Sequence, residues 1–176
     1  MNREHEFLQR LIRDVPDFPK PGILFKDITP LVRDPAGLKM ALDLLAAPFV
    51  GAGATAVAGM ESRGFIFGVP VAERLGVGFV PIRKPGKLPA AKIREEYALE
   101  YGTDALEMHA DAVGPGDRVI VVDDLLATGG TAAATVRLIR RAGAEIVGLA
   151  FVVELDFLSG RDKLADVPRV HSLLHY

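Results

Sequence analysis

The stretch Val119-Ile120-Val121-Val122-Asp123-Asp124-Leu125-Leu126-Ala127-Thr128-Gly129-Gly130-Thr131 decides the fold of this 176-residue chain. It begins with four β-branched apolar residues, a pattern typical of a strand buried on both faces of a parallel sheet. The acidic pair Asp123-Asp124 stands where this strand should end, and the glycine-rich residues 128–131 lead into a helical pattern over Ala132–Arg141. This order of strand, glycine loop and helix predicts an anion site in an open α/β sheet, because N–H groups of the loop and helix face the bound phosphate.

The two carboxylates limit what this anion site can bind. Asp123 and Asp124 would repel a bare phosphate, but they can accept hydrogen bonds from hydroxyl groups or face a magnesium-loaded ligand. The predicted ligand therefore carries both a phosphate and a diol, as a ribose 5-phosphate does. The residues alone also allow an ordinary turn between a strand and a helix, with two solvated acids.

The composition is that of one ordinary globular domain, with 49% apolar and 25% charged residues. A net charge of −2 argues against a basic surface for nucleic acid or for an acidic membrane. The absence of cysteine excludes disulfides and allows a reducing compartment. Residues 1–6 have no signal-peptide apolar core, and the interrupted run Leu44–Met60 is shorter than the ~20 residues of a spanning helix. We therefore expect a cytoplasmic protein without nucleic-acid or membrane partners.

Predicted helices alternate with predicted strands along the chain, which indicates an α/β fold with a mostly parallel sheet flanked by helices. Helical patterns cover Phe7–Ile12, Pro35–Ala47, Gly64–Leu75 and Ala132–Arg141, and strand patterns cover Ala54–Gly59, Gly78–Ile82, Val119–Val122 and Ile146–Val153. Residues from roughly 15 to 32 are rich in proline and predict an extended hood. Residues 83–96 predict a long loop, followed by a possible strand at Tyr97–Tyr101. No repeat or linker divides the chain, so residues 1–176 are expected to form a single domain.

Three further segments carry residues suited to binding or chemistry. Met60-Glu61-Ser62-Arg63-Gly64 lies between an expected strand and an expected helix, where N–H groups and the Arg63 cation can hold a second anion. Arg83, Lys84 and Lys87 place three cations at the start of the long loop, where they can stabilise a charged leaving group. Phe25 can stack on a flat ligand, although the residues alone favour a Phe that packs the hood onto the core.

These motifs together resemble those of the type I phosphoribosyltransferases, which use 5-phosphoribosyl 1-pyrophosphate (PRPP). The string Asp123–Thr131 resembles their PRPP loop, in the form found in the adenine-specific branch. Residues 60–64 resemble their pyrophosphate loop, where a cis peptide often occurs and is expected here at Glu61-Ser62. Residues 83–89 resemble their basic lid segment, residues 97–102 their Leu-Glu-Tyr-Gly segment, and residues 22–30 their adenine-binding stretch. The resemblance runs from about Phe18 to Tyr176.

The resemblance implies the type I phosphoribosyltransferase fold, with a small N-terminal hood and a flexible lid loop over about residues 83–96. It implies a purine salvage enzyme that transfers the 5-phosphoribosyl group from PRPP to adenine, giving AMP and pyrophosphate. Mg²⁺ would be held mainly through PRPP and water, with no direct protein ligand. The implied enzyme is a homodimer in which one basic lid residue serves the partner subunit.

The same resemblance implies a role for each site residue. The ribose and phosphate of PRPP would be bound by Asp123, Asp124, Leu125, Leu126, Ala127, Thr128, Gly129, Gly130 and Thr131. Pyrophosphate would be bound by Glu61, Ser62, Arg63, Arg83, Lys84 and Lys87. Adenine would be bound by Leu24, Phe25, Lys26, Tyr101 and Leu155, with Glu100 as the candidate for proton transfer. The family often has Arg where this chain has Lys26, so a role for that side chain is not implied.

Two alternatives share the PRPP loop. One is a sister enzyme for another base, such as xanthine, with a different hood. The other is a PRPP-sensing regulator that has kept the fold and lost catalysis. The basic lid, Glu100 and the negative net charge favour an enzyme over a DNA-binding regulator.

Overall fold

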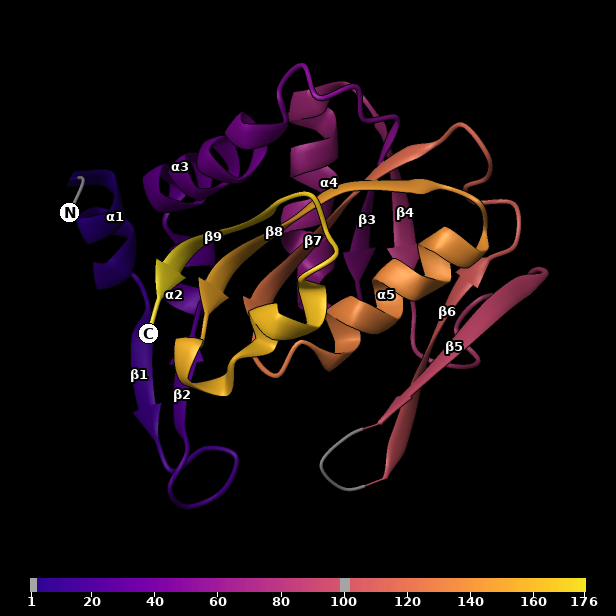
Figure 1. The fold of residues 1–176 in the computed structure, drawn as a ribbon. Helices are drawn as coiled ribbons and strands as arrows, with labels where there is room; N and C mark the ends of the chain where they lie inside the picture. Colours follow the sequence, from indigo (N-terminus) through magenta and orange to yellow (C-terminus); the bar gives the residue numbers. More distant parts are fainter. Residues whose placement is uncertain (1–2, 99–101) are drawn as a thin grey trace.

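The computed structural model describes residues 3–98 and 102–176. Within these ranges, a five-stranded parallel sheet with the order β4-β3-β7-β8-β9 forms the centre of the molecule (Figure 1). Its strands are β3 (Ala56–Met60), β4 (Gly78–Ile82), β7 (Arg118–Leu126), β8 (Glu145–Glu154) and β9 (Val170–His175). The quoted stretch lies in the middle strand, and its four β-branched residues are completely buried. The prediction of a central parallel strand is therefore confirmed.

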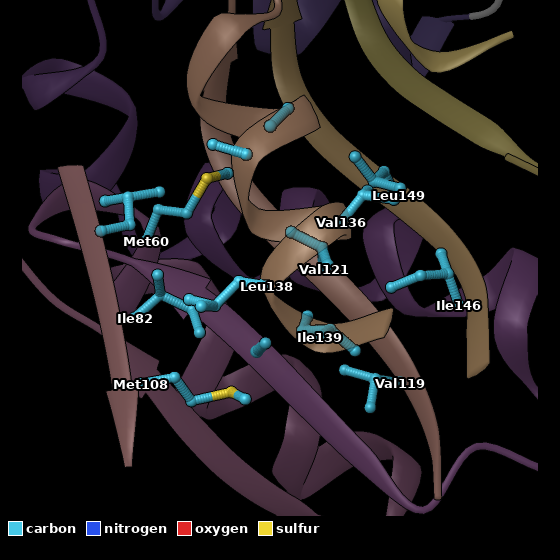
Figure 2. Close-up of a cluster of buried hydrophobic side chains, with 14 of the residues drawn as sticks. Met60, Ile82, Met108, Val119, Val121, Val136, Leu138, Ile139, Ile146 and Leu149 are labelled. Carbon is cyan, nitrogen blue, oxygen red and sulfur yellow. The ribbon is translucent and has the colours of Figure 1, made fainter. Parts of the chain in front are cut away.

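Helices cover both faces of this sheet (Figure 1). They are α1 (Arg3–Arg10), α2 (Thr29–Arg33), α3 (Pro35–Ala46), α4 (Arg63–Leu75) and α5 (Gly130–Arg141), with short 3-10 turns η1 (Ala47–Phe49), η2 (Asp156–Leu158) and η3 (Gly160–Leu164). Successive residues of β7 serve opposite faces, as the period of a strand requires. Val119 and Val121 pack with α5 in the cluster of Figure 2, whereas Ile120 and Val122 pack with α3 and α4.

Local signals set several helix ends where the sequence predicts them. Asp34 caps α3, because its Oδ1 accepts the N–H of Gly37 at 2.8 Å, and Pro35 occupies the first helical position. Gly76 closes α4 in the left-handed conformation, with φ +69°. The uncharged run Leu44–Met60 forms the end of α3, η1 and the buried β3, and no helix among the described residues is long and apolar enough to cross a membrane.

The prediction of a loop over residues 83–96 is wrong in its second half. Lys92–Ala98 forms β5, which pairs antiparallel with β6 (Thr103–His109), a strand that the sequence did not predict. The hairpin packs against α5, where Glu95 pairs with Arg137 and Arg141. Polar residues such as Glu95 stabilise this strand through partners that are distant in sequence. The strand therefore lacks the strong apolar alternation by which a strand is recognised from sequence.

Three other boundaries differ from the predictions. The hood is a two-stranded antiparallel unit of β1 (Arg13–Pro16) and β2 (Leu24–Asp27). The first helix ends at Arg10, before the predicted end at Ile12. The edge strand β9 was not predicted from the sequence of the tail. β7 continues to Leu126 because Asp123, Leu125 and Leu126 still pair with β8, so the acidic pair lies inside the strand instead of beyond its end.

Candidate active site

A cavity of about 240 Å³ opens at the carboxyl ends of the central strands, the edge where open α/β sheets bind their ligands. The turn after β3 contributes Glu61, Ser62 and Arg63, and the segment after β4 contributes Lys84. The remaining lining is the continuous stretch Asp123–Ala132. The fold therefore brings together the complete predicted PRPP loop and four of the six residues predicted for pyrophosphate.

The glycine loop presents an open helix end to this cavity. Gly129 occupies the N-cap position of α5 with φ +74°, a conformation that favours glycine. Because Gly129 has no side chain, it cannot cap the helix, and N–H groups of the first turn remain available for an anion. The helix dipole adds positive potential at the same point. This geometry suits a phosphate, as the sequence predicts.

The acidic pair is held beside that loop by a cation and by the backbone. Asp124 is only 4% exposed, and its Oδ2 lies 3.0 Å from Nε of Arg63. Asp123 accepts the N–H of Asp124 at 2.9 Å through its Oδ1. Burial, and then the neighbouring Asp124 carboxylate, raise the pKa of Asp123 well above its ordinary value. Burial also raises the pKa of Asp124, against the opposing charge of Arg63. Hydroxyl donors or a cation at this position would stabilise both ionised carboxylates.

Glu61 organises the cationic end of the cavity. Its peptide bond to Ser62 is cis, as predicted. Glu61 Oε2 accepts hydrogen bonds from Arg83 Nε at 2.9 Å and from the Lys84 N–H at 2.8 Å. These two bonds, the Arg83 bond first, lower the pKa of Glu61 despite its partial burial. Glu61 is therefore an ionised carboxylate that positions Arg83 and the start of the basic segment.

Lys84 is connected to the β5–β6 hairpin by residues that sequence reasoning missed. Its Nζ pairs with Asp104 of β6 and lies 3.2 Å from the hydroxyl of Tyr97 in β5. The same hydroxyl lies 3.4 Å from Oγ1 of Thr131 at the start of α5. The antiparallel bridge between Arg83 and Glu107 brings Asp104 of β6 to Lys84, and no local pattern marks this contact. Lys87 is exposed and does not line the cavity, although its charge contributes to the lowered pKa of Glu61.

The residues predicted to bind adenine lie outside the lining of this cavity, as far as the described residues define it. Phe25 is half-buried on β2, with its ring centroid 5.1 Å from that of Phe18 and 5.6 Å from the guanidinium carbon of Arg63. Arg63 thus contacts both the hood and the acidic pair. Leu24 is half exposed, and Leu155 is half-buried directly after β8.

Lys26 does not present its side chain freely. Its Nζ pairs with Asp14 at 2.7 Å and lies 3.9 Å from the ring centroid of Tyr176. Any contact between this position and a base would therefore use the main chain. Glu100 and Tyr101 lie outside the described residues, so their roles stay predictions.

The comparisons with known proteins agree with this geometry. The model of the phosphoribosyl transferase domain family matches residues 39–170. The chain is 63% identical to an adenine phosphoribosyltransferase of Methylococcus capsulatus over 169 residues, which covers 96% of this chain and 98% of that protein. The crystal structure of an adenine phosphoribosyltransferase from Rhodothermus marinus superposes with a TM-score of 0.93 at 55% identity and covers 98% of both chains.

A third similar protein was solved with ligands. The adenine phosphoribosyltransferase of Saccharomyces cerevisiae, complexed with adenine and an imino-altritol bisphosphate, has a TM-score of 0.92 at 41% identity, with 97% of this chain and 98% of that chain covered. The chain therefore belongs to the phosphoribosyltransferase family and is an enzyme of the α/β phosphoribosyltransferase fold. Within that family it belongs to the adenine phosphoribosyltransferases.

Proposed function

We propose that this enzyme transfers the 5-phosphoribosyl group of PRPP to adenine, giving AMP and pyrophosphate. The observation that carries the proposal is the single cavity wall made by Asp123–Ala132. It joins an acidic pair, in which Asp124 is buried and Asp123 partly buried, to an uncapped helix start. Such a wall matches a ribose that carries a 5′-phosphate, because hydroxyls meet carboxylates and the phosphate meets N–H groups. The adenine-specific relatives support adenine as the acceptor.

Each part of the cavity has a role in this reaction. Asp123 and Asp124 would accept hydrogen bonds from the ribose hydroxyls and offset the positive charge that develops on the sugar as pyrophosphate leaves. Residues 127–131 would hold the 5′-phosphate. Arg63, Arg83 and Lys84 would stabilise the departing pyrophosphate, with Lys87 approaching from the exposed segment. A purine ring nitrogen would then form the bond to ribose carbon 1 from the opposite face, and the purine would lose the proton of that nitrogen.

The base would lie between Phe25 and Leu155, with main-chain groups of Leu24 and Lys26 reading its edge. The contact between Arg63 and the Phe25 ring supports this placement, because it puts the hood next to the pyrophosphate end. Glu100 remains the proposed proton-transfer residue, and Tyr101 a proposed part of the base pocket.

Magnesium fits this donor set. Asp123 and Asp124 are hard oxygen donors whose ionisation is disfavoured by burial, so a divalent cation close to them would compensate their charge. The ion would be held mainly by the oxygens of PRPP and by water, because magnesium retains several waters. When bound, Mg²⁺ would neutralise charge on the pyrophosphate.

The proposal includes a homodimer in the cytoplasm. Helix α4 carries Arg63 at the cavity, and the same helix exposes two apolar side chains, Ile66 and Val69, which are 41% and 50% exposed. A second copy covering this surface would place a neighbouring subunit close to the site, where a lid cation could reach across. Size-exclusion chromatography with light scattering should give twice the 18.9 kDa of one chain. A monomer mass at micromolar concentration would contradict the dimer.

The cytoplasm is proposed because a cysteine-free chain needs no oxidising compartment.

Lys87→Ala tests the basic segment. Because Lys87 is exposed and close enough to influence Glu61, its loss should raise the KM for PRPP about three- to tenfold, the effect of one partly solvated charge contact. Steady-state kinetics with varied PRPP would measure this change. Lys39→Ala is the control, since the exposed Lys39 pairs with Asp43 on α3 and neither residue lines the cavity in the described chain. An unchanged KM in Lys87→Ala would remove the residue from the pyrophosphate site.

A base-competition assay tests the function itself. The enzyme receives Mg²⁺ and PRPP with adenine, hypoxanthine, guanine and xanthine together, and the nucleotides are separated by chromatography. AMP as the sole product would support both the PRPP loop and the hood assignment. Another nucleotide would retain the reaction type and overturn the base site. No nucleotide, with PRPP still bound, would indicate a regulator.

A further inference from the structure

The segment that follows β8 lies against the back of the glycine loop. A Cβ added at Gly160 would lie 2.1 Å from the carbonyl oxygen of Ala127, and one added at Gly129 would lie 2.3 Å from the carbonyl oxygen of Gly160. Both neighbours are backbone atoms, so neither can move without moving its segment. Gly160 has no positive φ, and its requirement for glycine therefore comes from this close approach alone.

The same segment begins at Leu155, which is proposed to contact the base. The Leu155 N–H donates to the carbonyl oxygen of Leu126 at 2.9 Å, just before the glycine loop starts. Leu155 thus contacts Leu126 just before the loop, and Gly160 lies against Ala127 and Gly129 within it. Residues 155–160 form one short connection between the proposed base subsite and the phosphate subsite.

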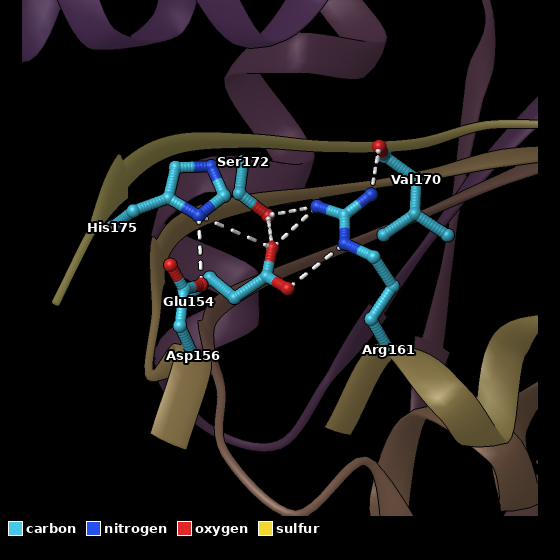
Figure 3. A network of polar contacts seen from close by, with 6 residues as sticks. All are labelled: Glu154, Asp156, Arg161, Val170, Ser172 and His175. Carbon is cyan, nitrogen blue, oxygen red and sulfur yellow. Dashed lines mark hydrogen bonds and ion pairs between the residues drawn. The ribbon is translucent and has the colours of Figure 1, made fainter. Parts of the chain in front are cut away.

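An ion-pair network fixes both ends of this connection (Figure 3). Arg161 donates from Nε to Oε1 of Glu154 at 2.9 Å and contacts its other oxygen through Nη2. Arg161 Nη1 also donates to the carbonyl oxygen of Val170 at 2.8 Å, and Ser172 Oγ donates to Glu154 Oε2 at 2.6 Å. Glu154 and Arg161 directly flank residues 155–160, so their contact closes the segment into a loop anchored on β9.

Glu154 is suited to this anchoring role because it is both buried and charged. It is 4% exposed. Burial alone would raise its pKa, but the bonds from Arg161 and Ser172 outweigh burial and lower it. Glu154, Asp156 and His175 also place ligand atoms within 4.8 Å of one another, as a metal site would require. The Arg161 guanidinium already covers Glu154, however, and its charge would oppose a metal ion there.

We propose that residues 155–160 couple the base subsite to the phosphate loop, with Gly160 and Arg161 as positioning residues. Gly160 sets the position of the loop by direct backbone packing. Arg161, through Glu154, sets the position of both Leu155 and Gly160. The inference rests on the proposed function for the identity of the two ligands. A disturbance on the side of the segment away from the cavity therefore weakens the binding of both ligands.

Gly160→Ala should raise the Kd for ribose 5-phosphate and the KM for PRPP by on the order of tenfold to a hundredfold, because a loop displaced by a fraction of an ångström no longer aligns its N–H groups. Calorimetric titration with ribose 5-phosphate measures the phosphate subsite without any turnover. Gly78→Ala is the matched control, since Gly78 has no positive φ and an added Cβ meets nothing within 4 Å. The control should bind like the wild type.

Arg161→Lys is the second variant and is expected to fold, because Lys keeps a charge beside Glu154. It loses the two-pronged contact and the bond to Val170, so the KM for adenine and the Kd for ribose 5-phosphate should each rise about threefold or more. Wild-type values for both ligands in Arg161→Lys, or in a folded Gly160→Ala, would overturn the coupling. A wild-type enzyme that binds ribose 5-phosphate but forms no AMP would instead reject the proposed function, while the titrations still test Gly160.

Discussion

Asp123→Asn should produce a protein that is more stable at neutral pH and much less active. Asn keeps the shape and the Oδ1 acceptor that receives the Asp124 N–H, but it carries no charge. A neutral amide cannot offset positive charge on the sugar, so kcat/KM for PRPP should fall about 100-fold or more, as for the loss of one preorganised electrostatic contact. Steady-state kinetics with PRPP and adenine would measure the loss.

The stability gain follows from the raised pKa of Asp123. A carboxyl whose pKa is higher in the folded than in the unfolded chain favours folding below the ordinary Asp pKa of ~3.9. That contribution is lost as the pH rises through the raised pKa of the folded state, because the folded protein must then ionise a partly buried group beside Asp124. Asn removes this ionisation. If the relief is about 1 kcal/mol, the unfolding temperature at neutral pH should rise by about 2–4 °C.

Asp124→Asn is the contrasting variant. It also removes a charge, but it leaves Arg63 without its partner at 3.0 Å and should therefore show no gain in stability. In the wild type, PRPP binding should strengthen as the pH rises through the raised pKa of Asp123, since the ionised carboxylate is the better acceptor of hydrogen bonds from the ribose hydroxyls. That limb of the pH profile should be absent in Asp123→Asn. An Asp123→Asn protein that is less stable than the wild type at neutral pH would contradict this interpretation of the acidic pair.

Gly129→Ala should lower kcat/KM for PRPP about 100-fold or more while leaving the protein folded. An alanine at φ +74° is strained by ~1–2 kcal/mol, and its Cβ would stand 2.3 Å from the carbonyl oxygen of Gly160. The loop must therefore move away from η3, and the N–H groups at the start of α5 lose their alignment with the 5′-phosphate. Kinetics with varied PRPP and a thermal unfolding curve would measure both consequences.

Gly76→Ala separates conformational strain from loop displacement. Gly76 has a similar φ of +69°, but an added Cβ meets nothing within 4 Å and the residue lies at the end of α4 away from the cavity. Both variants should unfold at lower temperature, whereas only Gly129→Ala should lose activity. A folded Gly129→Ala enzyme with kcat/KM within threefold of the wild type would show that the loop tolerates the crowding.

The elements that the sequence predicts well are those whose signal is local. Val119–Val122 is a continuous β-branched run, so its burial in a parallel sheet follows from the residues themselves. The acidic pair, the glycines and the apolar face of Ala132–Arg141 occur within one short stretch, so the phosphate site could be recognised before any fold was known. The N-cap at Asp34 and the cis bond at Glu61-Ser62 are similarly tied to short motifs.

The remaining features depend on partners that are far apart in the sequence. β5 is a polar strand stabilised by β6 and α5, so its own composition resembles that of a loop. Asp104 reaches Lys84 across twenty positions, and Ser172 reaches Glu154 across eighteen. No local pattern marks such pairs, because each residue alone is an ordinary polar residue.

By itself, therefore, the sequence determined the central strand, the loop that faces the phosphate and the family to which the chain belongs. Only the tertiary structure decided which cation pairs with which carboxylate, and that Gly160 lies against the back of the glycine loop. The physical reason is that backbone conformation and burial follow from neighbouring residues, whereas ion pairs and close backbone packing require two distant segments to meet.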